Sequence, residues 1–485
     1  MITLLGFAPD ADPTTPGVFV DCSNIVPTDT GFAAARSAVA VGVDALLAPS
    51  RGAVVVNKLD GTRRVFAGTQ TRLYELASTA WVERSKAGGY TGSIESRWSF
   101  AQFGDTTIAS NLADAMQAST TGAFADIAGA PRAKIVVSAS NNFVIAFNTN
   151  EGLYGPSPDR WWCCAQNDQT NWTPSVATGA TTGRLVAVGG PINAARTLGD
   201  YVVAYKGRGI FLGSFVGSPV QWQWNQIPGA DAGAVGPEAV CDVGVAHFIV
   251  GEDDFWMFDG TRPVPVGTDA VRKWFALDCS GTFRYRTKVS FDRQQGLVYI
   301  DYPSKGSTGA CDSRLVFYAG KKPSWGRANT VSQAPLNFIA PGVTIDGLDA
   351  YASTIDGLPD VPPDSPYWLA GGRMAAYFDA SNTLVSNSGV AGVSSFTTGD
   401  LGEDDAVTML DEVRLRFTKR PASAVATGFF KFNEGDDLQP GATCSINDGK
   451  FDLMQSGRWH RVRFDMVGDH TETAMKAKPV FVGGR

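Results

Sequence analysis

The stretch HFIVGEDDFWMFDGTRPVPVG, at residues 247–267, decides how the middle of the chain folds. Two apolar runs, HFIV and FWMF, flank the turn-forming letters GEDD, and the turn pair Asp-Gly follows the second run. This pattern is typical of a β-hairpin. The two prolines in TRPVPVG favour an outer edge strand or the exit from a sheet. The stretch also holds one of the three histidines, His247, and the acidic residues Glu252, Asp253, Asp254 and Asp259.

An acid/base site is the alternative interpretation of these carboxyl groups, and their spacing argues against it. Asp254 and Asp259 would stand at opposite ends of one strand, about 15 Å apart at about 3.3 Å per residue. Two carboxyl groups that share a catalytic step need a separation of about 5–9.5 Å. The cluster also lacks the spacing of a calcium-binding loop. We therefore predict a strand, a turn and a second strand, with solvated acids in the turn.

Similar apolar runs recur along the chain, each after a turn signal. Their landmarks at residues 65, 108, 143, 201, 248 and 297 are separated by an average step of about 46 residues. The runs are nearly continuous in apolar residues, which indicates strands buried on both faces. Hairpins repeated at this period are typical of the four-stranded blades of a β-propeller. We predict an all-β fold with a propeller of about six blades over residues 51–335.

The pattern changes on either side of this repeat. Residues 336–364 are rich in proline and predict a linker, and residues 365–485 alternate strictly between apolar and charged positions, as in EVRLRF and HRVRFDM. Alternation of this kind predicts an antiparallel sheet with one solvated face, and we expect a β-sandwich. Residues 1–50 are expected to be an extended segment, available to close a blade. One short connecting helix is predicted at 269–278, capped by Asp269.

Composition and charge exclude several classes of protein. The chain has 485 residues, 44% of them hydrophobic and only 18% charged, with a net charge of −7. No basic cluster occurs, which argues against a dedicated reader of nucleic acid. No apolar stretch approaches 18 residues and no secretion signal is present, so we expect no membrane anchoring. The seven cysteines lack metal-site spacing, and we predict free thiols even at the adjacent Cys163 and Cys164.

The residues that could carry chemistry form no catalytic constellation. The whole histidine supply is His247, which heads a buried strand, His460, which we place on the solvated face of its strand, and His470. No nucleophile elbow, phosphate-binding loop or HExxH motif occurs. We therefore predict no catalytic, cofactor-binding or metal-binding residues and no enzymatic activity.

Two segments keep an alternative function open. SFDRQQGLVY, at 290–299, resembles the Asp-box of sialidase-type propellers, which would suit a propeller glycosidase acting on a host surface polysaccharide. DRWWCCAQNDQTNW, at 159–172, could supply a glycan-binding platform from Trp161, Trp162 and Trp172. A tightly packed turn or a subunit contact is the competing interpretation of these tryptophans.

Four segments, taken in order, resemble one family. They are LLGFAPDADPTTPGVFVDCSNIVPTDTG (4–31), SFAQFGDTTIASNLADAMQ (99–117), EDDFWMFDGTRPVPVG (252–267) and WHRVRFDMVGDHTE (459–472). In this order they are similar to the tail hub, or nozzle, proteins of short-tailed phages (podoviruses), also called the tubular protein B or tail stabilisation class. The resemblance implies a propeller with associated β domains and no catalytic residues.

The resemblance also implies a place and partners. The protein would be a structural virion protein made in the host cytoplasm, a homohexameric ring in the tail below the portal and adaptor. Tail fibres or a tip protein would dock on it, and DNA would be ejected through it without specific binding. A weakly charged, acidic wall suits such passage, because cationic walls grip phosphates. Arginines of EVRLRF and HRVRFDM could meet the acidic turns GEDDA (402–406) and NEGDD (433–437) of the next subunit.

Overall fold

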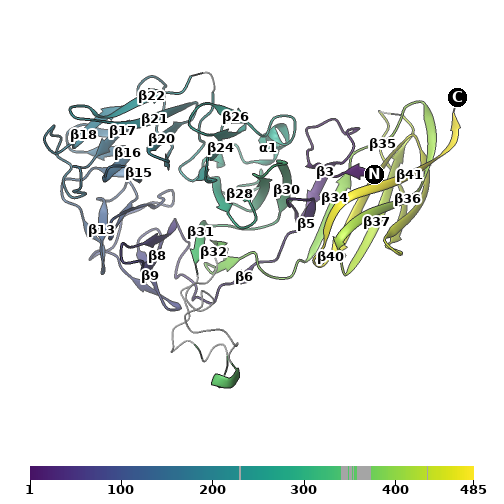
Figure 1. Ribbon diagram of the computed structural model, residues 1–485, viewed down its shortest axis with the longest axis horizontal. Coiled ribbons are helices and arrows are strands. Elements are labelled where there is room, and N and C mark those ends of the chain that lie inside the picture. The colour runs from purple at the N-terminus through teal and green to yellow at the C-terminus, as the bar shows by residue number, and fades with distance from the viewer. Residues whose placement is uncertain are drawn as a thin grey trace.

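The computed structural model describes residues 1–228, 231–339, 348, 352, 354–357, 373–433 and 435–484. Its strands form two bodies that lie side by side, a propeller and a sandwich of two sheets (Figure 1). Among these residues the α-helical content is one short helix, α1 (Arg272–Asp278). No helix in the described part of the chain is long and apolar enough to cross a membrane.

The propeller consists of antiparallel four-stranded units that mostly follow one another along the chain. The first three comprise β7 (Ala53–Asn57), β8 (Arg63–Gly68), β9 (Leu73–Ala77) and β10 (Ala80–Glu83); β11 (Ser99–Phe103), β12 (Thr106–Ser110), β13 (Gln117–Ser119) and β14 (Ala125–Asp126); and β15 (Arg132–Ala139), β16 (Phe143–Glu151), β17 (Gly155–Cys163) and β18 (Thr181–Arg184). The next three comprise β19 (Ala194–Leu198), β20 (Tyr201–Lys206), β21 (Gly209–Gly217) and β22 (Gln221–Gln226); β23 (Val240–Asp242), β24 (His247–Val250), β25 (Phe255–Phe258) and β26 (Pro263–Pro265); and β27 (Lys288–Asp292), β28 (Leu297–Tyr302), β29 (Ser313–Tyr318) and β30 (Ser324–Ala328). The last unit comprises β31 (Ala334–Ile339), β32 (Arg373–Phe378), β33 (Leu384–Ser386) and β6 (Val39–Ala40).

The first strands of these units close a ring. They contact one another in the cyclic order β7, β11, β15, β19, β23, β27 and β31, and β31 contacts β7 again. Six of the four-stranded sheets stand alone, which confirms the predicted all-β propeller of about six blades. The strands β27–β30 hold a further place in the ring, and their sheet continues through β4 into the sandwich. The sixth predicted landmark, residue 297, lies in this unit, at the start of β28.

The last unit corrects two predicted domain boundaries. Its strands β32 and β33 lie within 365–485, the range predicted as sandwich, and β31 continues to Ile339, inside the predicted linker 336–364. Almost all of the remaining linker range lies outside the described residues. The N-terminal strand β6 completes this unit by pairing with β33. Strands that pair across such separations leave no local repeat, so the periodicity could not reveal them.

The sandwich is built from both ends of the chain. One sheet contains β2 (Gly6–Phe7), β3 (Val18–Ser23), β34 (Val393–Thr398), β35 (Leu401–Gly402), β37 (Ser423–Lys431), β38 (Gln439–Ser445) and β40 (Trp459–Val467). The other contains β1 (Ile2–Thr3), β4 (Ile25–Pro27), β5 (Phe32–Ala34), β36 (Ala406–Lys419), β39 (Lys450–Gly457) and β41 (Thr471–Gly484). Residues 1–50 are thus more than an extended lead-in, because five strands of this segment belong to the sandwich sheets, while its strand β6 completes a propeller unit, as expected of a segment available to close a blade.

The helix α1 is capped from a distance. The predicted cap, Asp269, is wrong: the helix begins after Val271, which has no side-chain capping hydrogen bond. Instead the carboxylate of Asp10 accepts hydrogen bonds from the backbone N–H groups of Lys273 and Trp274. A free N–H in the first turn of a helix needs an acceptor, and the N-terminal segment supplies it.

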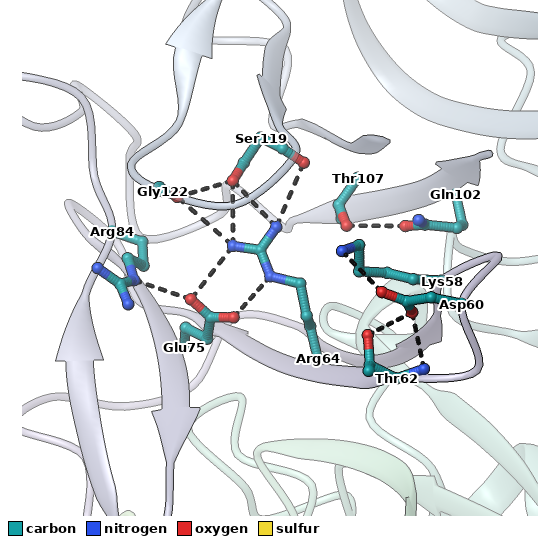
Figure 2. A network of polar contacts seen from close by, with 10 residues as sticks. All are labelled: Lys58, Asp60, Thr62, Arg64, Glu75, Arg84, Gln102, Thr107, Ser119 and Gly122. Carbon is teal, nitrogen blue, oxygen red and sulfur yellow. Dashed lines mark hydrogen bonds and ion pairs between the residues drawn. The ribbon is translucent and has the colours of Figure 1, made fainter. Parts of the chain in front are cut away.

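A buried arginine joins the first two blades (Figure 2). The Arg64 guanidinium on β8 donates to Glu75 Oε1 at 2.6 Å and to Glu75 Oε2 at 3.1 Å. Its Nη2 and Nη1 atoms reach the hydroxyl of Ser119, on β13 of the neighbouring blade, at 3.1 and 3.2 Å. Arg84 donates to the same Glu75 carboxylate at 2.8 Å. A charge on Glu75 therefore holds the network together.

Replacing Glu75 with glutamine should lower the free energy of unfolding by about 1–3 kcal/mol at neutral pH. Burial works to raise the pKa of Glu75, but the hydrogen bonds and charges of Arg64 and Arg84 outweigh it, so the pKa is lowered. A carboxyl whose folded pKa lies below its unfolded value stabilises the fold above the unfolded value and loses this contribution as the pH falls through the folded pKa.

The test is urea unfolding of the wild type and Glu75→Gln from pH 7 to pH 3. The difference in the free energy of unfolding between the two proteins should become smaller at the acidic end of this range. Glu83→Gln is the control, since Glu83 is half-exposed and its ion pair with Arg72 should contribute about 0–1 kcal/mol. A gap that stayed constant over the whole range would contradict the role given to the Glu75 charge.

Candidate functional site

The acidic stretch at residues 247–267 contains a hairpin, as predicted. β24 and β25 pair in the register His247↔Phe258 to Val250↔Phe255. Glu252 and Asp253 lie exposed in the turn between them, where Arg208 binds both at 2.9 and 3.2 Å. Exposed pairs of this kind are weak, and their carboxylates face solvent instead of a cavity.

The other two acids of the stretch organise the backbone. Asp254 is buried and accepts hydrogen bonds from the Phe255 N–H at 2.7 Å and from the Thr268 hydroxyl. Asp259 accepts from the Thr261 N–H at 2.9 Å and from its hydroxyl, and these bonds lower the pKa of Asp259. Both carboxylates are used to fix turns at the ends of β25.

Replacing Asp254 with alanine should lower the free energy of unfolding by about 1–3 kcal/mol, because the Phe255 N–H and the Thr268 hydroxyl lose their acceptor in a buried place. Asp253→Ala, in the exposed half of the same turn, should stay within about 0.5 kcal/mol of the wild type. Thermal unfolding of the two variants measures the difference. Equal effects would contradict the structural role assigned to Asp254.

The three histidines are buried in separate places. His247 shares hydrogen bonds with the Tyr205 hydroxyl at 2.6 Å and the Thr197 carbonyl at 2.9 Å, and burial lowers its pKa. His470 lies between Ser394, at 2.7 Å, and Glu472, at 2.6 Å. In the described part of the chain, no group of three or more His, Cys, Asp or Glu side chains could hold a metal ion.

The solvated position predicted for His460 is wrong. Its side chain is buried and lies 3.0 Å from the Thr408 hydroxyl, and burial lowers its pKa. Strand alternation explains the placement, since His460 shares the inward face of β40 with Val462, Phe464 and Met466.

The aromatic and sulfur-containing side chains of segment 159–172 are interior, while polar residues of its turn are exposed. Trp161, Trp162 and Trp172 are all buried, so they cannot form the exposed platform that the glycan-binding alternative requires. All seven cysteines are free, as predicted, including the buried neighbours Cys163 and Cys164.

The segment 290–299 is also a turn. Asp292 accepts hydrogen bonds from the N–H groups of Gln294 and Gln295, between β27 and β28. Its carboxylate is therefore engaged with backbone and points to no shared site.

The concave region of the molecule is the propeller axis. A cavity of about 620 Å³ is lined by all seven innermost strands. A second cavity, of about 430 Å³, adjoins it at the end where these strands begin. Arg97, Lys134, Pro237 and Glu238 line both. We call the second cavity the axial mouth, and its remaining charged side chains are Arg51, Glu95, Arg286 and Lys288.

Two ion pairs occupy part of the axial mouth. Arg97 Nε donates to Glu238 Oε2 at 2.7 Å, and another Arg97 nitrogen donates to the Gln333 carbonyl at 2.9 Å. Arg286 forms a close pair with Glu95, which also accepts from the Tyr285 hydroxyl at 2.8 Å. These bonds fix both carboxylates at the wall.

Sequence reasoning missed the axial mouth because its residues come from well-separated segments. One signal was available. A cationic residue stands at or near the start of the innermost strand in five of the blade units: Arg51, Arg97, Lys134, Arg196 and Lys288. Such a recurrence would have placed positive charge at one end of the axis once the propeller was assumed.

Comparison with known proteins shows no family for this chain. No family model and no curated protein matches the chain. Among solved structures, one described as YCF48 bound to D1 peptide has a TM-score of 0.33 at 13% identity, covering 62% of this chain and 86% of that chain. A glycoside hydrolase has a TM-score of 0.27 at 7% identity, covering 89% and 100%. The extracellular domain of the hybrid two component system BT3049 from B. thetaiotaomicron has a TM-score of 0.35 at 10% identity, covering 87% and 49%. TM-scores this low carry no argument about the activity or partners of this chain, whose own strands identify it as a β-propeller protein with an added sandwich.

Proposed function

We propose that this protein is a structural component of a short-tailed phage tail, the ring-shaped hub or nozzle below the portal and adaptor. DNA would be ejected through the ring, and fibres or a tip protein would dock on it. The sequence resemblance motivates this proposal. In this proposal the DNA passes through the space enclosed by the ring of subunits, and not along the axis of one propeller.

The observation that best supports assembly is an open, apolar sheet edge on β41. One side of β41 pairs with β36 along most of its length. The other side pairs with β5 and β1 only as far as Met475, and no other described strand continues along it. Beyond that point Val480, Phe481 and Val482 are 38%, 66% and 57% exposed. An exposed apolar strand edge is a template for pairing with another chain.

We base the proposed contact between subunits on this edge of β41 and not on the arginine-bearing strands EVRLRF and HRVRFDM. Arg461 is paired with Asp400, Arg463 with Asp465 at 2.9 Å, and Arg414 with Glu412 at 3.3 Å. These pairs within the chain use much of the charge that was expected to meet the acidic turns of the next subunit. If the β41 edge meets a different surface of the next subunit, the contact is heterologous, and such contacts close into a ring when their rotation divides a full turn.

The test is made on the particle. Cryo-microscopy of the virion should place the propeller and the sandwich as repeated copies around the tail axis, six if the ring is hexameric. Density for this chain in the capsid shell, or away from the tail axis, would overturn the proposal.

A matched pair of variants tests the edge. Phe481→Asp should leave the purified protein folded and prevent its incorporation into particles, measured by complementation of a phage that lacks the wild-type chain. Leu59→Asp changes an equally apolar, 81% exposed side chain in the turn after β7 and should be incorporated normally. Normal incorporation of Phe481→Asp would rule out the β41 edge as the subunit contact.

The glycosidase alternative has a direct test. Incubation with purified host capsule or lipopolysaccharide should leave chain lengths unchanged. Shortened chains that disappear in Glu252, Asp253 or Asp254 variants would replace the structural proposal by an enzymatic one.

A further inference from the structure

Positive charge is in excess at the axial mouth. Two carboxylates, Glu95 and Glu238, face five cationic side chains, Arg51, Arg97, Lys134, Arg286 and Lys288. Arg97 and Arg286 neutralise the two carboxylates by direct contact. Among the described residues, no carboxylate forms an ion pair with the other three cations, in a chain whose net charge is −7.

Arg51 is the first of these three. Its Nε atom is buried and has no hydrogen-bond partner among the described residues. Burial lowers the pKa of Arg51, and the positive charges of Arg97 and Arg286 lower it further. A guanidinium held beside two others, with an unsatisfied donor, is in an environment that favours an added anion.

Lys134 and Lys288 complete the set. Burial lowers the pKa of Lys134. Within the described residues, no hydrogen bond or ion pair to its ammonium group offsets this cost of burying the charge. Lys288 is only 5% exposed and donates to the Ser332 carbonyl at 3.0 Å and to Cys311 Sγ at 3.3 Å. Because an ammonium group carries three donors, one remains available.

We infer that the axial mouth binds an oxyanion, a phosphate or carboxylate group of a small polyanion, held by Arg51, Lys134 and Lys288. Cations that are partly or fully withdrawn from water and have no counter-ion are costly, and an anion that reaches them removes part of the cost. Guanidinium and ammonium groups bind phosphate and carboxylate oxygens through short, charge-assisted hydrogen bonds. The 430 Å³ volume suits a small molecule, since ligand pockets span about 300–1,000 Å³.

This inference is independent of the role in the tail. The lysines and arginines reach the mouth from four separate stretches of chain, so the sequence does not show them as one group. Because Glu95 and Glu238 are each paired with an arginine, the net charge of the site is positive. A compact polyanion should therefore bind better than a monovalent anion.

The experiment is calorimetric titration of the full chain at low ionic strength with inorganic phosphate, pyrophosphate and citrate, and with chloride as the reference. We expect saturable binding of one pyrophosphate or one citrate per chain, tighter than that of phosphate, with no saturable binding of chloride. Tighter binding of pyrophosphate than of citrate would assign the site to phosphate groups, and the reverse order to carboxylates. No saturable binding of any of the three would overturn the inference.

Variants test which residues form the site. Arg51→Gln and Lys134→Gln should each weaken binding about tenfold or more, the loss of one charged hydrogen bond. Arg184→Gln is the control, because Arg184 is 55% exposed on the outer strand β18 and pairs with Asp159. Unchanged affinity in both mouth variants, or an equal loss in the control, would overturn the assignment.

Thermal unfolding separates a lost site from a misfolded protein. Without added anion, Lys134→Gln should unfold at the same temperature as the wild type or higher, because a buried charge has been removed. Pyrophosphate should raise the unfolding temperature of the wild type and leave that of Lys134→Gln nearly unchanged. A Lys134→Gln protein that still gained the full shift would contradict the site.

Discussion

Replacing Arg314 with methionine is expected to lower the free energy of unfolding by about 3–5 kcal/mol, because Asp301 would be left buried without its counter-ion. Arg314 on β29 and Asp301 on β28 are 3% and 1% exposed and form two parallel bonds, of 2.5 and 3.0 Å. The guanidinium also lies between the rings of Tyr299 and Tyr377, 4.7 and 4.6 Å from their centroids. Burial works to lower the pKa of Arg314, but the charge and hydrogen bonds of Asp301 outweigh it and raise the pKa.

The position of Tyr377 extends this effect beyond one blade. Tyr377 is on β32, so the arginine joins the sheet of β27–β30 to the last unit of the ring. Urea unfolding followed by tryptophan fluorescence measures the loss. The double variant Arg314→Met, Asp301→Leu should recover much of the stability, since no unpaired charge remains. Arg293→Met, in an exposed pair with Asp242, should cost about 0–1 kcal/mol. A double variant no more stable than Arg314→Met would contradict the buried-charge explanation.

Truncating Phe396 to alanine is expected to cost about 3–5 kcal/mol, as for other buried phenylalanines. Phe396 on β34 is fully enclosed and stacks on Phe19 with ring centroids 4.3 Å apart. On its other side it packs on Phe464, at 5.1 Å. β34 lies between β3 and β40 in one sheet, so the ring packs against side chains from both neighbouring strands, and its loss opens a cavity on this face of the sheet.

Local loosening should accompany this loss of stability. Limited proteolysis of Phe396→Ala should cut the chain near residues 18–34 faster than in the wild type, because β3 loses its main packing partner. Val393→Ala, on the same strand but 63% exposed, should unfold within about 0.5 kcal/mol of the wild type and be cut at the wild-type rate. A protected N-terminal segment in Phe396→Ala would contradict the role assigned to this ring.

Local features of the fold were predictable from the sequence, and pairings between distant segments were not. The hairpin β24–β25 and the alternation of β40 follow from letters within about ten residues, because apolar runs and turn residues act locally. The pairing of β6 with β33, and the Asp10 carboxylate at the start of α1, join residues that no local pattern relates. The error at His460 was of another kind, since the alternation itself places this residue inward.

The axial mouth shows why a site can escape sequence reasoning. Its charges come from five short and separate stretches of the sequence: Arg51, residues 95–97, Lys134, Glu238 and residues 286–288. The ring arrangement converts these separate charges into a cluster, because it brings the starts of the innermost strands to one end of the axis. Only a correct count and order of the strands would reveal that cluster.

The way β6 completes the last propeller unit has a consequence for synthesis on the ribosome. β6 pairs with β33, β3 with β34 and β5 with β41, so segments made early wait for partners made late. At about 5–20 residues per second, the delay between β6 and β33 is of the order of tens of seconds. During that time the middle blades can form in order while the N-terminal strands keep unpaired edges. A chaperone that shields these edges until translation has passed β41 would therefore be expected to raise the yield of folded protein.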